Sequence, residues 1–268
     1  MISKVLINGE VSDGRIPVTD SSVLRGDGCF EVLKTYAGSV FALDDHLRRL
    51  ANSAERMDLP IPHASTLAHW IEQVAADVPD GAIRVVVTRG SSVAGVEGDP
   101  LVIVFGHPWD RGQNATRLHP VVAPWHASGV DWALSGAKII SYAPNMSATR
   151  VAAGAGFDDA LLISTDGLIL EGPTFSLAWV IDGTIETPSL DLGILDSITR
   201  RQVLSLANEV GLGTSEGAWP LDRLDGAGEV MCWSTIREVQ PVVAVGERSW
   251  APGKVTAVLA KRFSALTG

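Results

Sequence analysis

Lys138 is the residue of this 268-residue sequence whose type and surroundings best fit a nucleophile. The chain has 16 arginines but only five lysines, and Lys138 is the one lysine between positions 35 and 253. Its neighbours are small or apolar: Gly136, Ala137, Ile139 and Ile140. Burial among such residues would disfavour the charged ammonium, and only the free amine attacks a carbonyl carbon. The segment therefore predicts a lysine that bonds to a carbonyl compound, with a surface lysine at a strand end as the alternative.

Glu171 places a carboxylate directly after the apolar stretch 167–170. A buried acid costs several kcal/mol unless it meets a cation or a hydrogen-bond donor. A protonated pyridine nitrogen is a partner of this kind. The alternative is an exposed glutamate at the end of a strand.

The segment 193–200 leads through small polar residues into a helix that we predict from Thr199. The free N–H groups and the dipole at the N-terminus of a helix favour an anion. The segment therefore predicts a phosphate site, and simple capping by Ser or Thr is the alternative.

Composition and missing motifs argue against several classes of protein. A net charge of −10 and a pI near 5.0 disfavour nucleic-acid binding. No apolar run reaches the roughly 18 residues of a membrane span. The six histidines show no metal-ligand spacing, and the P-loop, Rossmann and GxSxG signatures are absent. Two cysteines, Cys29 and Cys232, and a first segment without an export signal indicate a cytoplasmic protein.

The elements that must position these residues predict an α+β fold, since strands and helices alternate without the regular repeat of a doubly wound sheet. We expect a small N-terminal α/β domain (1–108) that covers the substrate pocket, a linker (109–117) and a larger cofactor-binding α/β domain (118–268). The predicted strands are 4–7, 30–36, 83–88, 101–105, 118–123, 160–164, 168–170, 177–181, 230–233 and 242–245, with a hairpin return at 39–43. The predicted helices are 44–57, with Asp44 and Asp45 as its cap, 65–78, 146–155, 199–210 and 253–266.

These three segments, together with RGDGCFEVLKTYAG, HLRRLANSAERM and STIREVQPV, resemble class IV aminotransferases of pyridoxal-phosphate fold type IV. That group holds branched-chain aminotransferases, D-amino-acid aminotransferases and 4-amino-4-deoxychorismate lyases. The resemblance covers nearly the whole chain and implies the two-domain α+β fold of the group, with pyridoxal 5'-phosphate as cofactor. Because sites in this fold lie near a dimer interface, it also implies a homodimer.

Carried over position by position, Lys138 resembles the catalytic lysine that links covalently to the cofactor and transfers protons. Glu171 resembles the glutamate bonded to the pyridine nitrogen, and Arg49 resembles the phosphate-binding arginine. The resemblance implies further cofactor contacts: Tyr142 beside the cofactor, Leu195 on its ring face, Ile198 and Thr199 in the phosphate turn, and Ser234 and Thr235 closing that turn.

The predicted substrate residues lie on the strand that begins at Phe30. Branched-chain enzymes usually carry Gly and Arg where this chain has Val32 and Lys34, so the strand resembles that of D-amino-acid aminotransferases. Alternation points Phe30, Val32 and Lys34 to one face. The Arg-x-His pair that D-amino-acid aminotransferases carry shortly after this point is missing after Arg89, so the substrate carboxylate needs another cation. An arginine is preferred because its planar fork binds carboxylates in a bidentate manner; the candidates are Arg25, Lys34, Arg89 and Arg237.

The sequence thus favours a transaminase that moves an amino group from a D-amino acid, or from an (R)-amine, to a 2-oxo acid. GDGCF and the SYAPN stretch after Lys138 also occur in aminodeoxychorismate lyases, which give 4-aminobenzoate and pyruvate. That activity and a branched-chain-type transaminase stay open as alternatives. A non-catalytic protein that kept the fold is a third hypothesis, against which the intact Lys138 and Glu171 argue.

Overall fold

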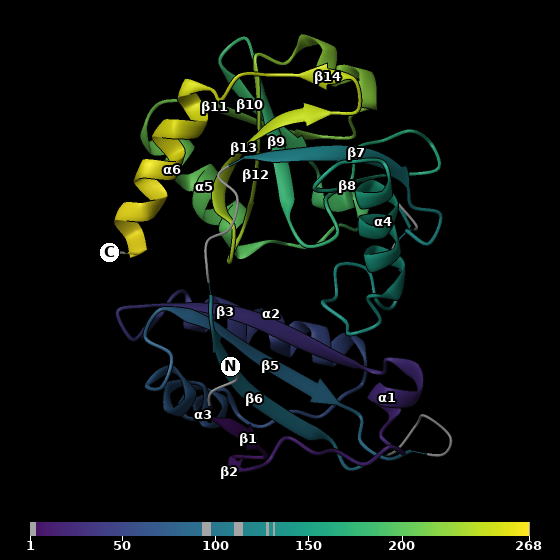
Figure 1. Cartoon of the computed structure of the whole chain (residues 1–268), viewed down its shortest axis with the longest axis vertical. Coiled ribbons are helices and arrows are strands. Elements are labelled where there is room, and N and C mark those ends of the chain that lie inside the picture. Colours follow the sequence, from purple (N-terminus) through teal and green to yellow (C-terminus); the bar gives the residue numbers. More distant parts are fainter. Residues whose placement is uncertain (1–3, 93–97, 110–114, 127–128, 131, 268) are drawn as a thin grey trace. The chain divides into compact units, whose positions relative to one another are not determined.

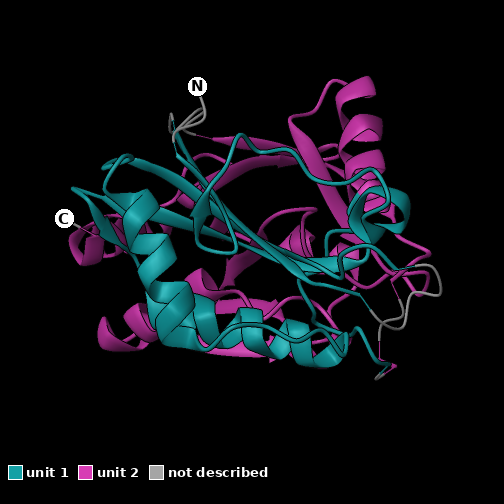
Figure 2. Ribbon diagram, turned by 90° about the horizontal axis from the view of Figure 1, so that it is seen from below, with its two compact units in different colours: residues 1–110, 132–142, 268 teal, residues 111–131, 143–267 magenta. Residues whose placement is uncertain are grey.

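The chain divides into two compact units, each with its own sheet, helices and core (Figures 1 and 2). A computed structural model describes residues 4–92, 98–109, 115–126, 129–130 and 132–267. Unit 1 comprises Met1–Asp110 and Trp132–Tyr142, and unit 2 comprises Arg111–Asp131 and Ala143–Thr267. The mixture of helices and sheets in both units confirms the predicted α+β class.

Unit 1 contains a six-stranded sheet in the order β2-β1-β6-β5-β3-β4, in which all neighbours are antiparallel. Its strands are β1 (Val5–Ile7), β2 (Glu10–Val11), β3 (Gly28–Tyr36), β4 (Ser39–Val40), β5 (Gly81–Thr88) and β6 (Leu101–Pro108). Its helices are α1 (Ser21–Arg25), α2 (Leu43–Arg56) and α3 (Ala64–Ala75). The runs of Val and Ile in β5 and β6 explain why these strands form the centre of the sheet.

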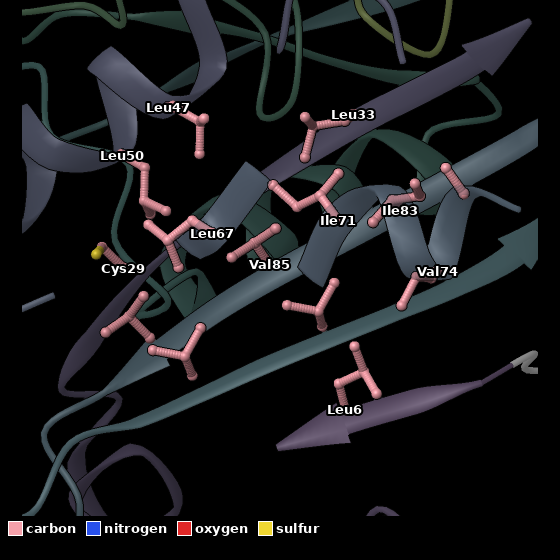
Figure 3. Packing of buried hydrophobic residues seen from close by; sticks show 14 of the residues in the cluster. Leu6, Cys29, Leu33, Leu47, Leu50, Leu67, Ile71, Val74, Ile83 and Val85 are labelled. Atoms are coloured by element: carbon pink, nitrogen blue, oxygen red, sulfur yellow. The ribbon is translucent and has the colours of Figure 1, made fainter. Parts of the chain in front are cut away.

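The core of unit 1 lies between this sheet and helices α2 and α3 (Figure 3). Leu33 and Val85 contribute from the sheet, and Leu47, Leu50 and Ile71 contribute from the helices. Side chains alternate along a strand, so the odd-numbered residues of β3 near its start point toward the helices and the even-numbered ones point away. The two faces of β3 therefore separate structural residues from those predicted to meet substrate.

The segment Trp132–Tyr142 belongs to unit 1, although the predicted domain division assigns it to the C-terminal part. Residues 28–30 of β3 pair with β5 on one side. On their other side they pair with the segment Trp132–Tyr142, through a bridge between Cys29 and Ile139. This long-range pairing is the reason that the units do not follow one break in the sequence. The predicted linker (109–117) includes residues 110–114, which lie outside the described residues, and Thr116 already begins β7.

Helix α1, which the sequence analysis did not predict, is held by the buried residue Asp20. One carboxylate oxygen of Asp20 accepts the N–H of Ser22 at 2.7 Å, and the other accepts the hydroxyl of Thr88 at 2.8 Å. The helix ends at Gly26, where φ is +70° and a Cβ atom would lie 2.6 Å from Ser141 Oγ. Only glycine tolerates this conformation and approach without strain.

Unit 2 contains an eight-stranded mixed sheet in the order β11-β10-β9-β12-β13-β7-β8, with β14 paired to β13. Its strands are β7 (Thr116–Val122), β8 (Asp159–Ile163), β9 (Ser176–Ile181), β10 (Thr184–Pro188), β11 (Gly213–Gly217), β12 (Glu229–Ser234), β13 (Glu238–Val245) and β14 (Arg248–Ser249). Its helices are α4 (Ala143–Gly154), α5 (Ile198–Glu209) and α6 (Lys254–Thr267), with short 3-10 helices at Leu190–Leu192 and Leu221–Gly226. Helix α4 packs on β7 and β8, whereas α5 and α6 pack on each other and on β12.

Several local features differ from the sequence predictions, among them strands β2, β10 and β14, which were not predicted. Helix α2 begins at Leu43 after Ala42, which has a φ of +49°, so Asp44 and Asp45 lie in its first turn rather than at its cap. The predicted strand 168–170 forms only the isolated bridges of Leu168 and Ile169 within the described residues. Strand β11 was missed because its sequence, GTSEG, lacks the apolar alternation that marks a strand.

No helix within the described part of the chain combines the length and the apolar character that crossing a bilayer requires.

Glu229 gives a test of how α6 is attached. Its buried carboxylate on β12 accepts the N–H groups of Val255 and Thr256 at 3.1 and 2.9 Å, and the hydroxyl of Thr256 at 2.7 Å. We expect Glu229→Gln to lower the free energy of unfolding by about 1–3 kcal/mol, because hydrogen bonds to a charged acceptor are lost. Urea denaturation should leave the exposed control Glu247→Gln within about 0.5 kcal/mol of the parent; equal stability of both variants would contradict this account.

Candidate active site

The backbone around Lys138 is fixed by hydrogen bonds within unit 1. The N–H of Phe30 donates to the carbonyl of Lys138 at 3.0 Å, and the N–H of Ile140 donates to the carbonyl of Gly28 at 2.9 Å. The N–H of Lys138 itself donates to Ser53 Oγ at 3.0 Å. Lys138 thus lies between the edge of β3 and helix α2, rather than in a free loop.

The amine of Lys138 lies against two aromatic side chains. Its Nζ atom is 4.3 Å from the centre of the Phe30 ring and 3.5 Å from the Tyr142 hydroxyl, to which it donates a hydrogen bond. The rings of Phe30 and Tyr142 pack edge to face with centres 5.2 Å apart. Lys138 is half-buried. An amine held against aromatic rings and hydrogen-bonded to a hydroxyl is positioned as a nucleophile or a proton carrier requires.

Arg49 lies on the opposite face of β3, where it forms a buried ion pair. Its Nε and Nη2 atoms donate to the two carboxylate oxygens of Glu31 at 2.7 and 2.8 Å. His46, one turn earlier on α2, has its Nδ1 atom 2.8 Å from Glu31 Oε2. Because the carboxylate can only accept, Nδ1 carries the proton and donates. Arg49 as a phosphate-binding residue stays a prediction. Two of the three nitrogens of its guanidinium, Nε and Nη2, already bind Glu31.

The charges of this cluster follow from its burial. Burial alone would raise the pKa of Glu31, but the charge of the Arg49 guanidinium and the hydrogen bonds from Arg49 and His46 outweigh it and hold that pKa well below its usual range. Burial lowers the pKa of His46 more than Glu31 raises it, so His46 is neutral near pH 7. This network was not predicted from the sequence. The sequence signal for it is that His46 and Arg49 lie three residues apart on one helical face, while Glu31 alternates with the substrate-facing positions of its strand.

The predicted substrate residues Phe30, Val32 and Lys34 are absent from the helix-facing core of unit 1, as expected for the other face of β3. Val32 pairs with Arg84 across to β5. Lys34 is buried, with its Nζ atom 4.6 Å from the centre of the Tyr36 ring.

The candidate cations for a substrate carboxylate differ in how far they are engaged. Arg89 donates to Asp27 at 2.7 Å and to the carbonyls of Met57 and Asp58 at 2.6 and 3.2 Å. Arg25, the last residue of α1, is exposed, and its Nη1 atom donates to the carbonyl of Ser92 at 3.4 Å. Residues 93–97, where the Arg-x-His pair is missing from the sequence, lie outside the described residues.

In unit 2, Glu171 is held close to Leu195. The N–H of Leu195 donates to Glu171 Oε1 at 3.2 Å, and the carbonyl of Glu171 accepts the N–H of Leu162 at 2.9 Å. Glu171 is half-buried. Its carboxylate is thus fixed beside the residue predicted to pack on a cofactor ring.

Helix α5 begins with a side-chain cap and an unsatisfied hydroxyl. Ser197 Oγ accepts the N–H of Arg200 at 3.3 Å, and Ile198 and Thr199 follow it, both fully buried. Thr199 Oγ1 has no hydrogen-bond partner among the described residues. A buried hydroxyl without a partner is costly, so this atom fits an anion bound at the helix N-terminus.

Ser234 ends β12, and Thr235 begins the turn that follows it; the two residues are called the Ser234–Thr235 turn below. Ser234 Oγ accepts the N–H of Arg237 at 3.1 Å, and Glu238 has a φ of +56°. Unit 1 thus supplies a half-buried amine, and unit 2 supplies a fixed carboxylate and a helix N-terminus with an unsatisfied hydroxyl; these are the kinds of group that pyridoxal 5'-phosphate would need.

The family model for amino-transferase class IV matches residues 28–245 of this chain. The chain is 32% identical to a D-alanine aminotransferase of Bacillus licheniformis, over 94% of this chain and 93% of that protein. It is 30% identical to a bifunctional aminodeoxychorismate lyase / D-amino acid transaminase of Mycobacterium tuberculosis, over 84% of this chain and 89% of that protein.

Solved structures agree with these sequence matches. A fold IV transaminase of Curtobacterium pusillum superposes with a TM-score of 0.87 at 31% identity, covering 97% of this chain and 93% of that one. A hypothetical aminotransferase of M. tuberculosis gives TM-scores of 0.90 in a PLP-bound form and 0.89 in a form with α-ketoglutarate and PMP, at 26% identity and 99% coverage of both chains. A branched-chain aminotransferase of Thermoproteus uzoniensis with norvaline gives 0.89 at 26% identity, with 98% and 94% covered.

The neutral His46 predicts a pH dependence of stability. Unfolding returns the pKa of His46 from its lowered value to its ordinary 6.5, so the unfolded chain binds more protons below that pH and stability falls. Glu31 acts in the same direction but only below about pH 4.5. We expect His46→Asn, which keeps a donor but does not titrate, to remove up to about 2 kcal/mol of the loss between pH 7 and pH 5.

Urea denaturation at pH 5, 6 and 7 measures this difference. His69→Asn, which replaces an exposed histidine of the same unit that caps no helix, serves as the control and should follow the parent curve. Parallel curves for the parent and His46→Asn would contradict the neutral, buried state of His46.

Proposed function

Because the chain belongs to the class IV aminotransferases, with the α+β fold type IV and pyridoxal 5'-phosphate as cofactor, we propose that it transfers an amino group from a D-amino acid to a 2-oxo acid. Support for the donor class comes from the strand residues Phe30, Val32 and Lys34 and from the similarity to a D-alanine aminotransferase. Support for the acceptor comes from the similar structure that holds α-ketoglutarate. (R)-amines are a further proposed donor class.

The observation that carries this proposal is the position of the Lys138 amine, 3.5 Å from the Tyr142 hydroxyl and 4.3 Å from the centre of the Phe30 ring. The chemistry that pyridoxal 5'-phosphate supplies when bound is withdrawal of electrons from the substrate α-carbon, which lets that carbon release a proton. In our proposal Lys138 binds the cofactor covalently and moves this proton with its Nζ atom. Tyr142 orients the amine, and Phe30 excludes water beside it.

Residues of unit 2 bind the remaining groups of the cofactor in this proposal. Glu171, whose carboxylate is fixed by the N–H of Leu195, holds a proton on the pyridine nitrogen. Leu195 packs on the ring. The phosphate-binding residues are Ile198, Thr199, Ser234 and Thr235, and Arg49 of unit 1 adds a positive charge.

We assign the substrate carboxylate to Arg25. Arg89 is engaged by Asp27 and two backbone carbonyls, whereas Arg25 is exposed and, among the described residues, makes one long contact. Its neighbour Gly26 accepts a 2.7 Å hydrogen bond from the hydroxyl of Ser141, three residues after Lys138, so Arg25 lies next to the Lys138 segment. Phe30, Val32 and Lys34 then face the substrate side chain, and Arg89 supports α1 through Asp27.

A second candidate function is the lyase reaction that gives 4-aminobenzoate and pyruvate. The observation that favours it is the 30% identity to a protein named for both activities. A branched-chain-type transaminase is the other alternative, supported by the similar structure from T. uzoniensis.

We also propose that the protein is a cytoplasmic homodimer; its two cysteines are free and buried, which suits a reducing compartment.

The donor is tested by following the absorption spectrum of the holoenzyme in single half-reactions. We expect D-alanine or D-glutamate to convert the bound cofactor to its amine form, and a 2-oxo acid to restore the aldehyde form. Lys138→Ala should show no conversion. Conversion by L-leucine but not by D-amino acids would favour a branched-chain transaminase. Release of 4-aminobenzoate from aminodeoxychorismate, without formation of the amine form of the cofactor, would favour the lyase. Either outcome contradicts the proposal.

The role of Arg25 predicts a change in substrate binding. We expect Arg25→Gln to raise the KM for a D-amino acid by about 10- to 100-fold, because a charge-assisted contact to the carboxylate is lost. Arg25→Lys should recover part of the loss. The matched control is Arg15→Gln, which removes an exposed arginine of the same unit. An unchanged KM in Arg25→Gln would exclude this assignment.

A further inference from the structure

Arg237, one of the candidate cations for the substrate, is held by a carboxylate of unit 2. Its Nη2 atom donates to Asp159 Oδ2 at the start of β8. Asp159 is buried, and its other oxygen accepts the hydroxyl of Thr149 on α4 and the N–H of Ala160, both at 2.9 Å. The charge of the Arg237 guanidinium is therefore neutralised by a carboxylate that is hydrogen-bonded to both α4 and β8.

The same guanidinium stacks on Phe175, with its Cζ atom 4.6 Å from the centre of the ring. Phe175 in turn closes the loop that follows Glu171. The N–H of Gly172 donates to the carbonyl of Phe175 at 2.8 Å, and a Cβ atom on Gly172 would lie 2.1 Å from the Phe175 ring. Arg237 thus covers the ring that packs directly on the residue after Glu171.

The backbone of Arg237 belongs to the turn that carries Ser234 and Thr235. Its N–H donates to Ser234 Oγ at 3.1 Å. One residue therefore contacts the turn through its main chain, Asp159 through its Nη2 atom and Phe175 through the face of its guanidinium.

We propose that Arg237 is a positioning residue that fixes the Ser234–Thr235 turn and the Glu171 loop relative to each other. This inference rests on the proposed function, in which the turn binds the cofactor phosphate and Glu171 binds the pyridine nitrogen. Arg237 then acts on both ends of the cofactor without touching substrate. Loss of Arg237 would leave the turn less fixed and remove the stacking contact on Phe175. It would also leave the buried Asp159 carboxylate without its cation.

Arg223 offers a matched control within the same unit. It also forms an arginine–carboxylate pair, with Nε and Nη2 2.9 and 2.6 Å from the oxygens of the buried Glu186, and it also stacks on an aromatic ring, 5.1 Å from the centre of Trp219. Among the described residues, these contacts involve neither the Ser234–Thr235 turn nor the Glu171 loop. Arg223→Gln therefore reproduces the general cost of losing such a pair.

The test titrates apoprotein with pyridoxal 5'-phosphate and with pyridoxal, which lacks the phosphate, and follows absorbance and the melting temperature. We expect Arg237→Gln to weaken the binding of both compounds by about tenfold or more and to shift the absorption band of the bound cofactor. Arg237→Lys should recover part of the affinity. Arg223→Gln should bind both compounds like the parent. If Arg237→Gln fails to fold, Asp159→Asn/Arg237→Gln removes both charges and should show the same loss of affinity.

A substitution of Phe175 tests the connection to Glu171. We expect Phe175→Leu to reproduce the spectral shift, and the effects of Phe175→Leu and Arg237→Gln to be less than additive, because both act through one contact. A loss confined to the phosphate-bearing compound, or equal losses in Arg223→Gln, would overturn the inference. So would a raised KM for substrate with unchanged cofactor affinity, since that would make Arg237 a direct substrate contact. Failure of the parent protein to bind the cofactor would instead refute the proposed function.

Discussion

The hydrogen bonds between residues 138–140 and the edge of β3 are the constraint on which the candidate site depends. They join segments that lie more than 100 residues apart in the sequence, and they place the Lys138 amine on the Phe30 ring. A lysine side chain has four rotatable bonds and loses considerable entropy when it is fixed. The hydrogen bonds of its backbone to a strand edge and the contact of its Nζ atom with the Phe30 ring offset this cost and hold the amine at one position.

A second constraint is that three of the arginines predicted to bind cofactor or substrate are paired with carboxylates. Glu31 binds Arg49, Asp27 binds Arg89, and Asp159 binds Arg237. Breaking such a pair by removing one partner is strongly destabilising, since the other charge stays buried. The pairs therefore anchor segments. Arg25, which is exposed, and Thr199 Oγ1, which has no partner among the described residues, have further capacity for a ligand.

Much of the fold was predictable because its elements carry regular apolar spacing. Strand β3 and helix α2 match the sequence expectation within two residues, and the family followed from several short motifs in order. The start of α2 at a left-handed Ala42 had no sequence signal, and neither did the polar edge strand β11. The pairing of Lys138 with β3 depends on a long-range contact that periodicity does not encode. The Glu31–His46–Arg49 network was within reach of alternation and helical spacing, but only once both elements were placed side by side.

The central claim is that the Lys138 amine carries the cofactor. Borohydride reduction of the holoenzyme fixes the covalent link to pyridoxal 5'-phosphate, and digestion followed by mass spectrometry then locates the modified peptide. The account predicts that the label lies on Lys138 and on none of Lys4, Lys34, Lys254 and Lys261. A label on any of those four, or no label on a protein that has bound the cofactor, would contradict it.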